Sequence, residues 1–318
     1  MVLDQECQRK VVKRLSLGEG KKEEKSYQLN KLLMTNLQTI KSSKDFQLAK
    51  KGLFVRSHSF LIQAYQSEEK IIRLYPQKNL FSHIIGQIDD DNNGISGLEM
   101  SFNDQLKKNI NPLKLTIDTD LQYLIREELI KSEEIFQNIG SAAILMNINS
   151  GEVLSLISLP DFNLNKRQTI TDLNFTNKIT KGVYELGSVF KTLTLASAFE
   201  YEILEPTTMF ENLEKKIYCA GNPISEYDEK LPTDLNAEQI LIRSSNIGSV
   251  RIAQKVGIDK YKTFLEKIGV LDKIKFDIEE IGQPLNFRWG KCKLATTSFG
   301  HGITTTPLQL AKAYSIIS

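Results

Sequence analysis

The feature that most limits how this chain can fold is a lysine at the start of an apolar helical stretch. Val, Phe, Leu and Ala fill residues 189–199 almost all round, a pattern that predicts a buried helix. Ser188 precedes Lys191 by three residues, and residues at this spacing share one helix face. Gly187 permits a tight turn just before the serine. Burial lowers the pKa of an amine toward that of a useful base, so the pattern predicts a serine nucleophile activated by a lysine.

A second short motif, Ser244-Ser245-Asn246, follows downstream within a helical pattern. Neither motif is specific alone, because Ser67-Glu68-Glu69-Lys70 and Ser101-Phe102-Asn103 repeat the two spacings elsewhere. We interpret the first of these decoys as a solvated face, since it lies in a charged stretch. The order and flanks of the motifs therefore carry the functional prediction.

Four ordered segments resemble class B penicillin-binding proteins, the peptidoglycan transpeptidases. Residues 184–191 resemble their active-site motif, and residues 295–302, followed by 305–311, resemble their downstream signature. Residues 80–86 and 94–99 resemble segments that precede the transpeptidase domain in that family. The Ser-Phe-Gly-x-Gly form of the downstream signature is more like the division-specific subgroup than the elongation-specific one.

The resemblance implies roles for four residues. Ser188 would attack the carbonyl between the terminal D-alanines of a stem peptide, with Lys191 as general base. Ser244 would relay the proton to the leaving D-alanine, and Asn246 would hydrogen-bond both Lys191 and the substrate amide. β-Lactams would acylate the same serine. The structural alternative makes Ser188 a helix N-cap, Lys191 a chain reaching solvent, and Ser244 and Asn246 turn residues.

The expected fold is α/β (α+β), with a transpeptidase-like domain of the penicillin-binding proteins. A helix is predicted from about residue 119 to 137, with Asp118 or Thr119 as N-cap. A β-hairpin is predicted over residues 142–157 around an Asn-Ser-Gly turn. Such interleaving of helices with a hairpin is typical of a sheet covered by helices.

Three regions are expected along the chain. Residues 1–28 form a charged, unassigned leader, residues 29–112 a partial pedestal domain, and residues 113–318 the transpeptidase domain. The sequence contains no Lys-Thr-Gly or Lys-Ser-Gly, a motif that the resembled family carries after the segment matching residues 305–311. We therefore expect a fragment whose domain is C-terminally incomplete. Its sheet would expose apolar surface near Ile144, Leu156 and the Ser188 helix.

The resembled family is anchored in the inner membrane and faces the periplasm, and its partners include other cell-division proteins. This chain shows no signal-peptide core and no run of 18 apolar residues. We expect membrane contact only through an anchor outside these residues. The alternatives are a catalytically silent product that acts as a binding module, and, less well supported, a serine β-lactamase or penicillin sensor.

Composition narrows the partners further. A formal net charge of +2 gives no strong attraction to nucleic acid, and we expect none. No cofactor or metal is expected, because the histidines are dispersed and the acidic run at residues 89–94 lacks the spacing of a calcium loop. The three cysteines, Cys7, Cys219 and Cys292, show no disulfide or metal spacing. We interpret them as unpaired bystanders.

Overall fold

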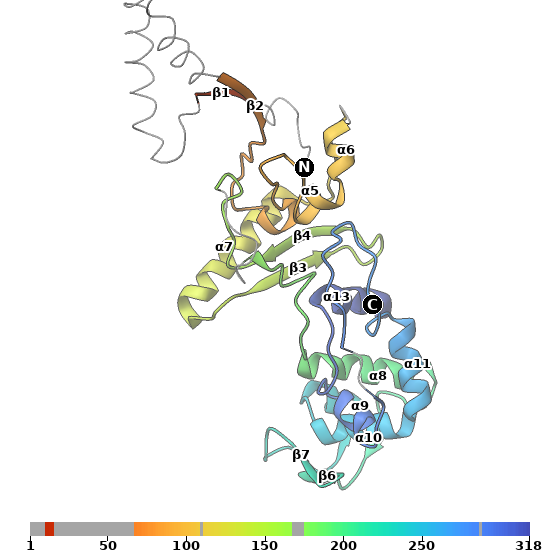
Figure 1. Ribbon diagram of the computed structural model, residues 1–318. Coiled ribbons are helices and arrows are strands. Elements are labelled where there is room, and N and C mark those ends of the chain that lie inside the picture. The colour runs from red at the N-terminus through yellow and green to blue at the C-terminus, as the bar shows by residue number, and fades with distance from the viewer. Residues whose placement is uncertain (1–9, 16–66, 109–110, 167–174, 286–287) are drawn as a thin grey trace, which may run out of the picture. The chain divides into compact units, whose positions relative to one another are not determined.

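The computed structural model of the chain describes residues 10–15, 67–108, 111–166, 175–285 and 288–318 (Figure 1). Its contacts divide the chain into two units, Asp4–Leu74 and a larger unit that contains Tyr75–Ser318. In the smaller unit, strand β1 (Lys10–Leu15) pairs antiparallel with strand β2 (Ser67–Ile72). The Ser-x-x-Lys decoy therefore lies on a strand, whereas the motif at Ser188 belongs to a helical segment.

The domain boundaries predicted at residues 28 and 112 remain predictions. The contacts group residues 75–112 with the rest of the larger unit, and most of the predicted leader lies outside the described residues. Within the ranges given above, no helix combines the length and apolar character needed to cross a membrane.

The first part of the larger unit is an antiparallel hairpin with helices beside it. Strand β3 (Ala142–Met146) pairs with β4 (Val153–Ser158), which confirms the predicted hairpin. Helix α7 (Thr119–Phe136) contacts β4 (Figure 1), and the Asp118 side chain caps its first turn by accepting two backbone N–H bonds, as predicted. The preceding short helices are α4 (Ser82–Ile85), α5 (Gly97–Ser101) and α6 (Asn103–Lys108). We call α4, α7, β3 and β4 the hairpin group.

A buried glutamine ties α7 to the hairpin. Gln122 donates through Nε2 to Leu80 O at 3.0 Å and to Leu156 O at 2.8 Å. Its Oε1 accepts from Ser155 Oγ at 2.8 Å and from the Leu156 N–H at 2.9 Å. All four hydrogen-bonding positions of the amide are thus satisfied, so this polar group can be buried without a desolvation penalty left uncompensated.

The second part of the larger unit is helical and surrounds α8 (Phe190–Glu200). Helix α8 contacts α10 (Asn246–Val256) and α11 (Ile258–Lys267), as Figure 1 shows. The remaining elements of this part are β5 (Met209–Phe210), β6 (Lys216–Cys219), β7 (Asn222–Ser225), β8 (Leu235–Asn236), α9 (Ala237–Ile242), α12 (Lys293–Thr297) and α13 (Pro307–Ile317). We call α8 to α12 the helical group.

Local capping fixes where two of these helices start. Asn236 and Gln239 form a reciprocal capping box at α9, and Thr306 and Gln309 form another at α13. Pro307 occupies the first turn of α13, where its missing N–H costs no hydrogen bond. These residues place the two helices by local rules that the sequence already contains.

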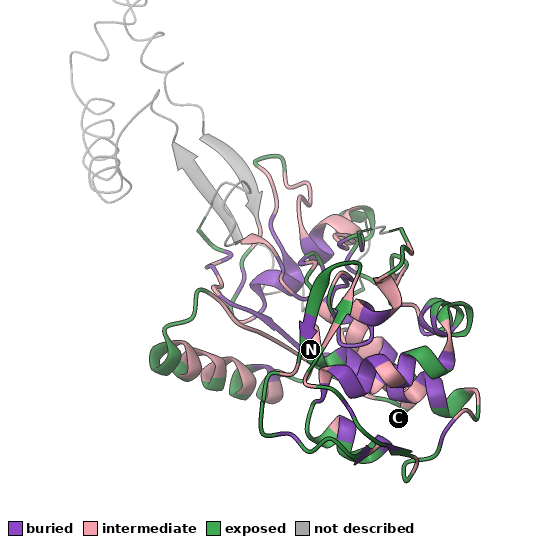
Figure 2. Cartoon of the chain, turned by 90° about the horizontal axis from the view of Figure 1, so that it is seen from below, coloured by how far each residue is buried: buried purple, intermediate pink, exposed green. Residues whose placement is uncertain are grey.

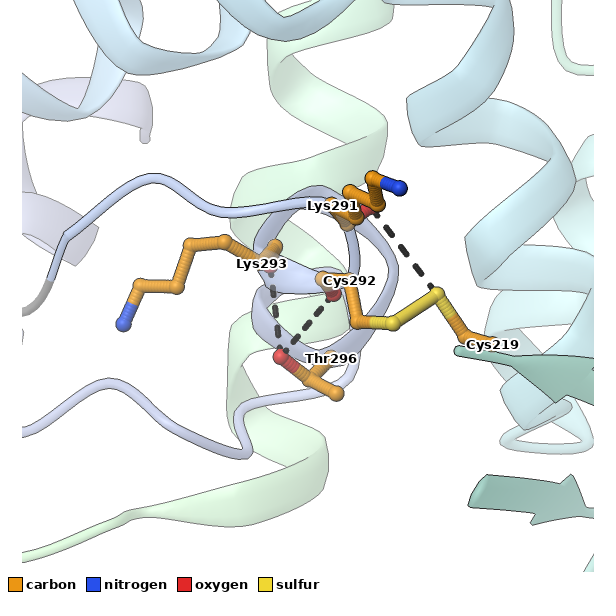
Figure 3. Close-up of a disulfide and its surroundings, with 5 residues drawn as sticks. All are labelled: Cys219, Lys291, Cys292, Lys293 and Thr296. Carbon is orange, nitrogen blue, oxygen red and sulfur yellow. Dashed lines mark hydrogen bonds between the residues drawn. A yellow bond between two sulfur atoms is a disulfide. The ribbon is translucent and has the colours of Figure 1, made fainter. Parts of the chain in front are cut away.

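The prediction of unpaired cysteines is wrong for two of the three. Cys219, at the end of β6, forms a disulfide with Cys292, which immediately precedes α12 (Figure 3). Their Cα atoms lie 5.7 Å apart although 73 positions separate them in sequence. Sequence spacing could not reveal this pair because the fold alone brings β6 to α12. The 3.9 Å contact between Cys219 Sγ and Lys291 O is packing, since a disulfide sulfur has no proton to donate.

The predicted exposure near the serine helix is seen at Val189 and Phe199, which are 40% and 38% exposed, but not at most of the residues considered. Leu156 is buried, Phe190 and Leu193 in α8 are fully buried, and Ile144 is half-buried. Exposed apolar side chains occur in both groups. In and beside the hairpin group they are Tyr123, Leu124, Ile135, Phe136, Ile139, Leu145 and Ile148, and in and beside the helical group they include Val189, Phe199, Met209, Tyr218, Ile242 and Ile258. The two long helices differ nonetheless: Figure 2 shows α7 mostly pink and green and much purple in the helical group.

Candidate active site

Ser188 lies in a single 3-10 turn, η3 (Gly187–Val189), that leads directly into α8. The buried helix predicted over residues 189–199 is α8, which begins at Phe190. Gly187 has a positive φ of 63°, a conformation that glycine adopts without steric cost. The turn leaves Ser188 exposed while Lys191, one helical turn later, is only 3% exposed. A reachable hydroxyl therefore lies above a buried amine.

The Lys191 amine makes three polar contacts. Nζ lies 3.1 Å from Ser188 Oγ, 2.8 Å from Ser244 Oγ and 2.6 Å from Ser244 O. This confirms the predicted approach of Ser188, Lys191 and Ser244. It excludes the alternative in which Lys191 reaches solvent. The alternative N-cap role of Ser188 also fails, since its side chain caps neither η3 nor α8.

Burial changes the acid–base chemistry of this amine. Desolvation lowers the pKa of Lys191 to about 8, and the nearby Glu226 carboxylate acts in the opposite direction. At this pKa roughly a tenth of the amines are neutral at pH 7. Lys191 can therefore accept a proton near neutral pH, which an exposed lysine does far less readily.

Ser244 comes from the connection between α9 and α10 and has a positive φ of 53°. A serine rarely adopts this conformation, and such outliers persist where their surroundings hold them. Both of its oxygens lie against Lys191 Nζ. The strained backbone thus directs one carbonyl and one hydroxyl at the same amine.

Asn246 lies in the first turn of α10, two residues after Ser244. Its side-chain Nδ2 donates to Ser225 O at 2.9 Å, at the end of β7. Among the contacts of the described residues, no hydrogen bond joins Asn246 to Lys191, so this part of its predicted role is not seen in the structure. Asn246 begins the helix that follows the Ser244 turn, and its contact with the substrate amide remains a prediction.

The downstream signature packs directly on the serine turn. A Cβ added at Gly300 would lie 1.9 Å from Gly187 O, so only glycine permits this approach. The backbones of Tyr184 and Thr305 exchange two hydrogen bonds of 3.0 Å. On α8, the Thr194 hydroxyl lies 2.8 Å from Ser298 O. Segments more than a hundred residues apart thus form one site, as their joint resemblance to one family predicts.

Sequence reasoning missed one charged residue of this site. Glu226 follows β7 and accepts hydrogen bonds from the Ser245–Ile247 segment. No motif in the sequence distinguishes Glu226 from the other carboxylates nearby, such as Glu229. Only the folded arrangement shows that it reaches the loop that carries Ser244.

Comparison with known families agrees with this geometry. Residues 141–318 match the family described as the penicillin binding protein transpeptidase domain. Since the match covers more than half of the chain, the chain belongs to the penicillin-binding protein transpeptidases. The relatives named below place it in class B and in the division subgroup, which confirms the resemblance seen in the sequence.

Two curated relatives are named peptidoglycan D,D-transpeptidase FtsI. The probable FtsI of Caulobacter vibrioides is 32% identical over 256 residues, covering 79% of this chain and 43% of the relative. The FtsI of Buchnera aphidicola is 30% identical over 281 residues, covering 78% of this chain and 48% of the relative. The chain thus spans about half the length of the curated relatives it matches.

Solved structures show the same fold. The apo form of penicillin binding protein 3 from Mycobacterium tuberculosis superposes with a TM-score of 0.69 at 22% identity, over 77% of this chain and 58% of that one. A peptidoglycan glycosyltransferase from Burkholderia ambifaria gives a TM-score of 0.56 at 26% identity, over 64% and 60%. The predicted transpeptidase-like α+β fold is confirmed.

Proposed function

We propose that this chain forms part of a serine D,D-transpeptidase that cross-links peptidoglycan stem peptides during cell division. The observation that carries the proposal is the convergence of Ser188 Oγ, Ser244 Oγ and Ser244 O on the buried Lys191 amine. The names of the FtsI relatives supply the substrate class. The proposal therefore rests on local geometry for the chemistry and on kinship for the substrate.

The three contacts suit the neutral form of Lys191. A neutral amine has two N–H donors and one lone pair. The donors can point to Ser244 O and Ser244 Oγ, which leaves the lone pair to accept the Ser188 proton. Ser188 then attacks the carbonyl between the terminal D-alanines, while Lys191 acts as general base. The protonated amine regains three donors for three acceptors, so each charge state of Lys191 is matched by its neighbours.

The remaining steps use the turn before α10 and the first residue of that helix. Ser244 relays the proton to the leaving D-alanine, and Asn246 binds the substrate amide. An amine from a second stem peptide then attacks the acyl-serine and completes the cross-link. The Ser188 N–H lies at the start of the η3–α8 helical segment, where backbone donors and the helix dipole stabilise a developing oxyanion.

β-Lactams are proposed as alternative acyl donors for Ser188. Structures of the Mycobacterium tuberculosis protein are described as complexes with aztreonam and with ampicillin. The strained lactam amide presents a carbonyl in place of the D-alanyl-D-alanine bond. We propose that the same serine opens this ring and remains acylated.

The proposed location is the periplasmic face of the inner membrane, with an anchor outside these 318 residues and other division proteins as partners. The Cys219–Cys292 disulfide supports an exported domain, because disulfides persist mainly in oxidising compartments. Kinship to the FtsI proteins supports the division role.

A catalytically silent chain is the second candidate. It is favoured by the absence of Lys-Thr-Gly or Lys-Ser-Gly from the 318 residues, because by resemblance that strand supplies an oxyanion donor and a clamp on the substrate carboxylate. Loss of one oxyanion donor slows such reactions by about 10²–10³-fold. The 318 residues alone are therefore expected to react slowly.

Release of D-alanine from a synthetic stem pentapeptide separates the candidates. The 318-residue chain is compared with the same chain joined to the Lys-Thr-Gly-containing segment of a relative. We expect slow release from the first, release about 10²–10³-fold faster from the second, and none from either after Ser188→Ala. No release from the joined chain would support the silent candidate, and release that survives Ser188→Ala would exclude Ser188 as nucleophile.

A further inference from the structure

One carboxylate outside the predicted motifs, that of Glu226, accepts several hydrogen bonds from the start of helix α10. Glu226 Oε1 accepts from Ser245 Oγ at 2.6 Å and from the Ile247 N–H at 3.0 Å, and Oε2 accepts from the Asn246 N–H at 2.8 Å. Three successive residues thus donate to one side chain. Since hydrogen bonds to a charged acceptor are stronger than neutral ones, Glu226 holds this segment firmly.

The position of these donors explains their need for a partner. The first N–H groups of a helix have no acceptor within the helix, and its N-terminal end favours negative charge. Ser245 caps α10 locally by accepting from the Gly248 N–H at 2.9 Å. Glu226 satisfies the Asn246 and Ile247 amides that this local cap leaves open.

The hydrogen bonds to Glu226 begin one residue after Ser244, which contacts Lys191. Ser244 directly precedes Ser245, and its positive φ directs its carbonyl and hydroxyl at Lys191 Nζ. A non-glycine residue keeps such a conformation only when its neighbours hold it. Glu226 holds the three residues that follow Ser244, so it fixes the position from which Ser244 reaches the amine.

Glu226 is itself held by a cross-linked hairpin. It follows β7 directly, and its N–H donates to Lys215 O at 3.1 Å. Strand β7 pairs with β6, where Cys219 is bonded to Cys292 at the start of α12. Helix α12 in turn contacts α10. The carboxylate therefore reaches the start of α10 from a hairpin that is joined covalently to α12, a helix that also contacts α10.

We infer that Glu226 is a positioning residue of the proposed acyl-transfer site: its carboxylate holds the Ser245–Ile247 segment so that Ser244 receives the Lys191 amine. The inference rests on the proposed function for its catalytic meaning. The hydrogen bonds between the Glu226 carboxylate, at the end of β7, and the start of α10 do not depend on the proposed function. Glu226 also acts on Lys191 through space, because its negative charge favours the protonated amine.

The test compares Glu226→Gln with Glu229→Gln in the full chain. Both variants remove one negative charge from the same segment, but Glu229 is exposed and serves as the matched control. Two readouts are independent of activity: amide hydrogen exchange at Asn246 and Ile247, and the pKa of Lys191 from NMR of ¹³C-labelled lysine. Lys191→Arg identifies the lysine signal.

In Glu226→Gln we expect exchange at both amides to accelerate about tenfold or more. Glutamine keeps one acceptor oxygen, so one of the two N–H groups loses its acceptor and the other is left with a neutral one. We also expect the pKa of Lys191 to fall below its value of about 8 in the unchanged chain, because an attractive charge is lost. A purely structural role would not move this pKa. Glu229→Gln should leave both readouts unchanged.

Unchanged exchange and an unchanged lysine pKa in Glu226→Gln would overturn the inference, as would equal changes in Glu229→Gln. If Glu226→Gln does not fold, Ser245→Ala tests the same contacts, because it removes the 2.6 Å hydroxyl bond to Glu226 together with the cap on the Gly248 N–H. Unaltered Asn246 and Ile247 exchange in that variant would also overturn the inference. Failure of the proposed function has a different signature, since an inactive wild-type chain would still show both effects of Glu226→Gln.

Discussion

The helical group and the hairpin group bury their helices to very different extents. In the 11-residue α8, Phe190, Leu193 and Ala198 are fully buried, and a disulfide closes the region around it. In the 18-residue α7, Gln122 is the buried residue, while Ile135 and Phe136 are more than 70% exposed. Apolar packing thus holds the region of the serine, whereas α7 depends strongly on polar contacts.

The difference bears on function. Deep burial around α8 is what lowers the pKa of Lys191, so the chemistry lies in the better-packed group. The hairpin group supports the site from outside and contains its own buried polar residues, Gln122 and His83. The contrast predicts different responses of the two groups to mutation, reduction and acid.

The largest expected effect comes from truncating matched phenylalanines. Phe190→Ala in α8 should lower the free energy of unfolding by about 3–5 kcal/mol, because it opens a cavity in a closed core. Phe136→Ala at the end of α7 should change it by about 0.5 kcal/mol or less, as for other surface sites. Denaturant unfolding of the two variants measures the difference. Similar losses in both would contradict the contrast in burial.

Reduction of the disulfide should come next. Chain-entropy arguments assign about 4 kcal/mol to a cross-link that closes a loop of this length. We expect dithiothreitol to lower the midpoint of thermal unfolding of the chain. The double variant Cys219→Ser, Cys292→Ser should unfold at the lower temperature with or without reductant. A midpoint of the unchanged chain that is insensitive to reduction would show that the cross-link does not stabilise the helical group.

Acid should affect the hairpin group through His83. This residue is 7% exposed, and its Nε2 donates to Pro160 O at 3.1 Å, since a carbonyl can only accept. Burial lowers the pKa of His83 to about 4, against the opposing effect of this hydrogen bond. The unfolded state then binds more protons between pH 6.5 and 4, so stability falls as the pH falls through this range.

The lowered pKa of His83 corresponds to a loss of about 3 kcal/mol in the free energy of unfolding across this pH range. Unfolding measured at several pH values should show this decline, and His83→Asn should reduce it. His301→Asn is the matched control, because His301 is exposed and should leave the pH dependence as it was. If the decline disappears in His301→Asn and persists in His83→Asn, the pH dependence does not come from His83.

How far the sequence predicts the fold depends on whether the cause is local. The Asp118 cap, the hairpin around Asn149-Ser150-Gly151 and the approach of Ser188, Lys191 and Ser244 follow from short patterns or from ordered family motifs. The Cys219–Cys292 pair and the role of Glu226 depend on where a distant hairpin lies. The spacing of residues along the chain does not determine where that hairpin packs, so these two contacts could be found only in the structure.

The distribution of exposed apolar surface could not be predicted for a related reason. An incomplete sheet was expected to expose Leu156 and the helix after Ser188. Instead Leu156 is buried in a core cluster that includes Val153 and Leu308, and Gln122 of α7 bonds its backbone. Apolar side chains are exposed on α7, such as Phe136, and at scattered positions of the helical group, such as Ile242. The helix that covers a two-stranded sheet has no further layer above it in the described residues.

The smallest expected effect is the pH dependence of acylation. In the proposed mechanism the neutral form of Lys191 is the base, and the pKa of about 8 makes the neutral fraction rise about tenfold between pH 7 and pH 9. The rate of acylation by a fluorescent penicillin should rise by the same factor and then level off. A rate that is flat across this range would show that deprotonation of Lys191 does not limit the reaction.

The central claim is that Ser188, held beside the Lys191 amine, is the residue that becomes acylated. Mass spectrometry of peptides after long incubation with benzylpenicillin tests it directly in the unchanged chain, Ser188→Ala and the decoy variant Ser67→Ala. We predict a penicilloyl adduct on the peptide that contains Ser188, formed slowly, unaffected by Ser67→Ala and absent after Ser188→Ala. An adduct on another serine, or labelling that persists in Ser188→Ala, would contradict the account.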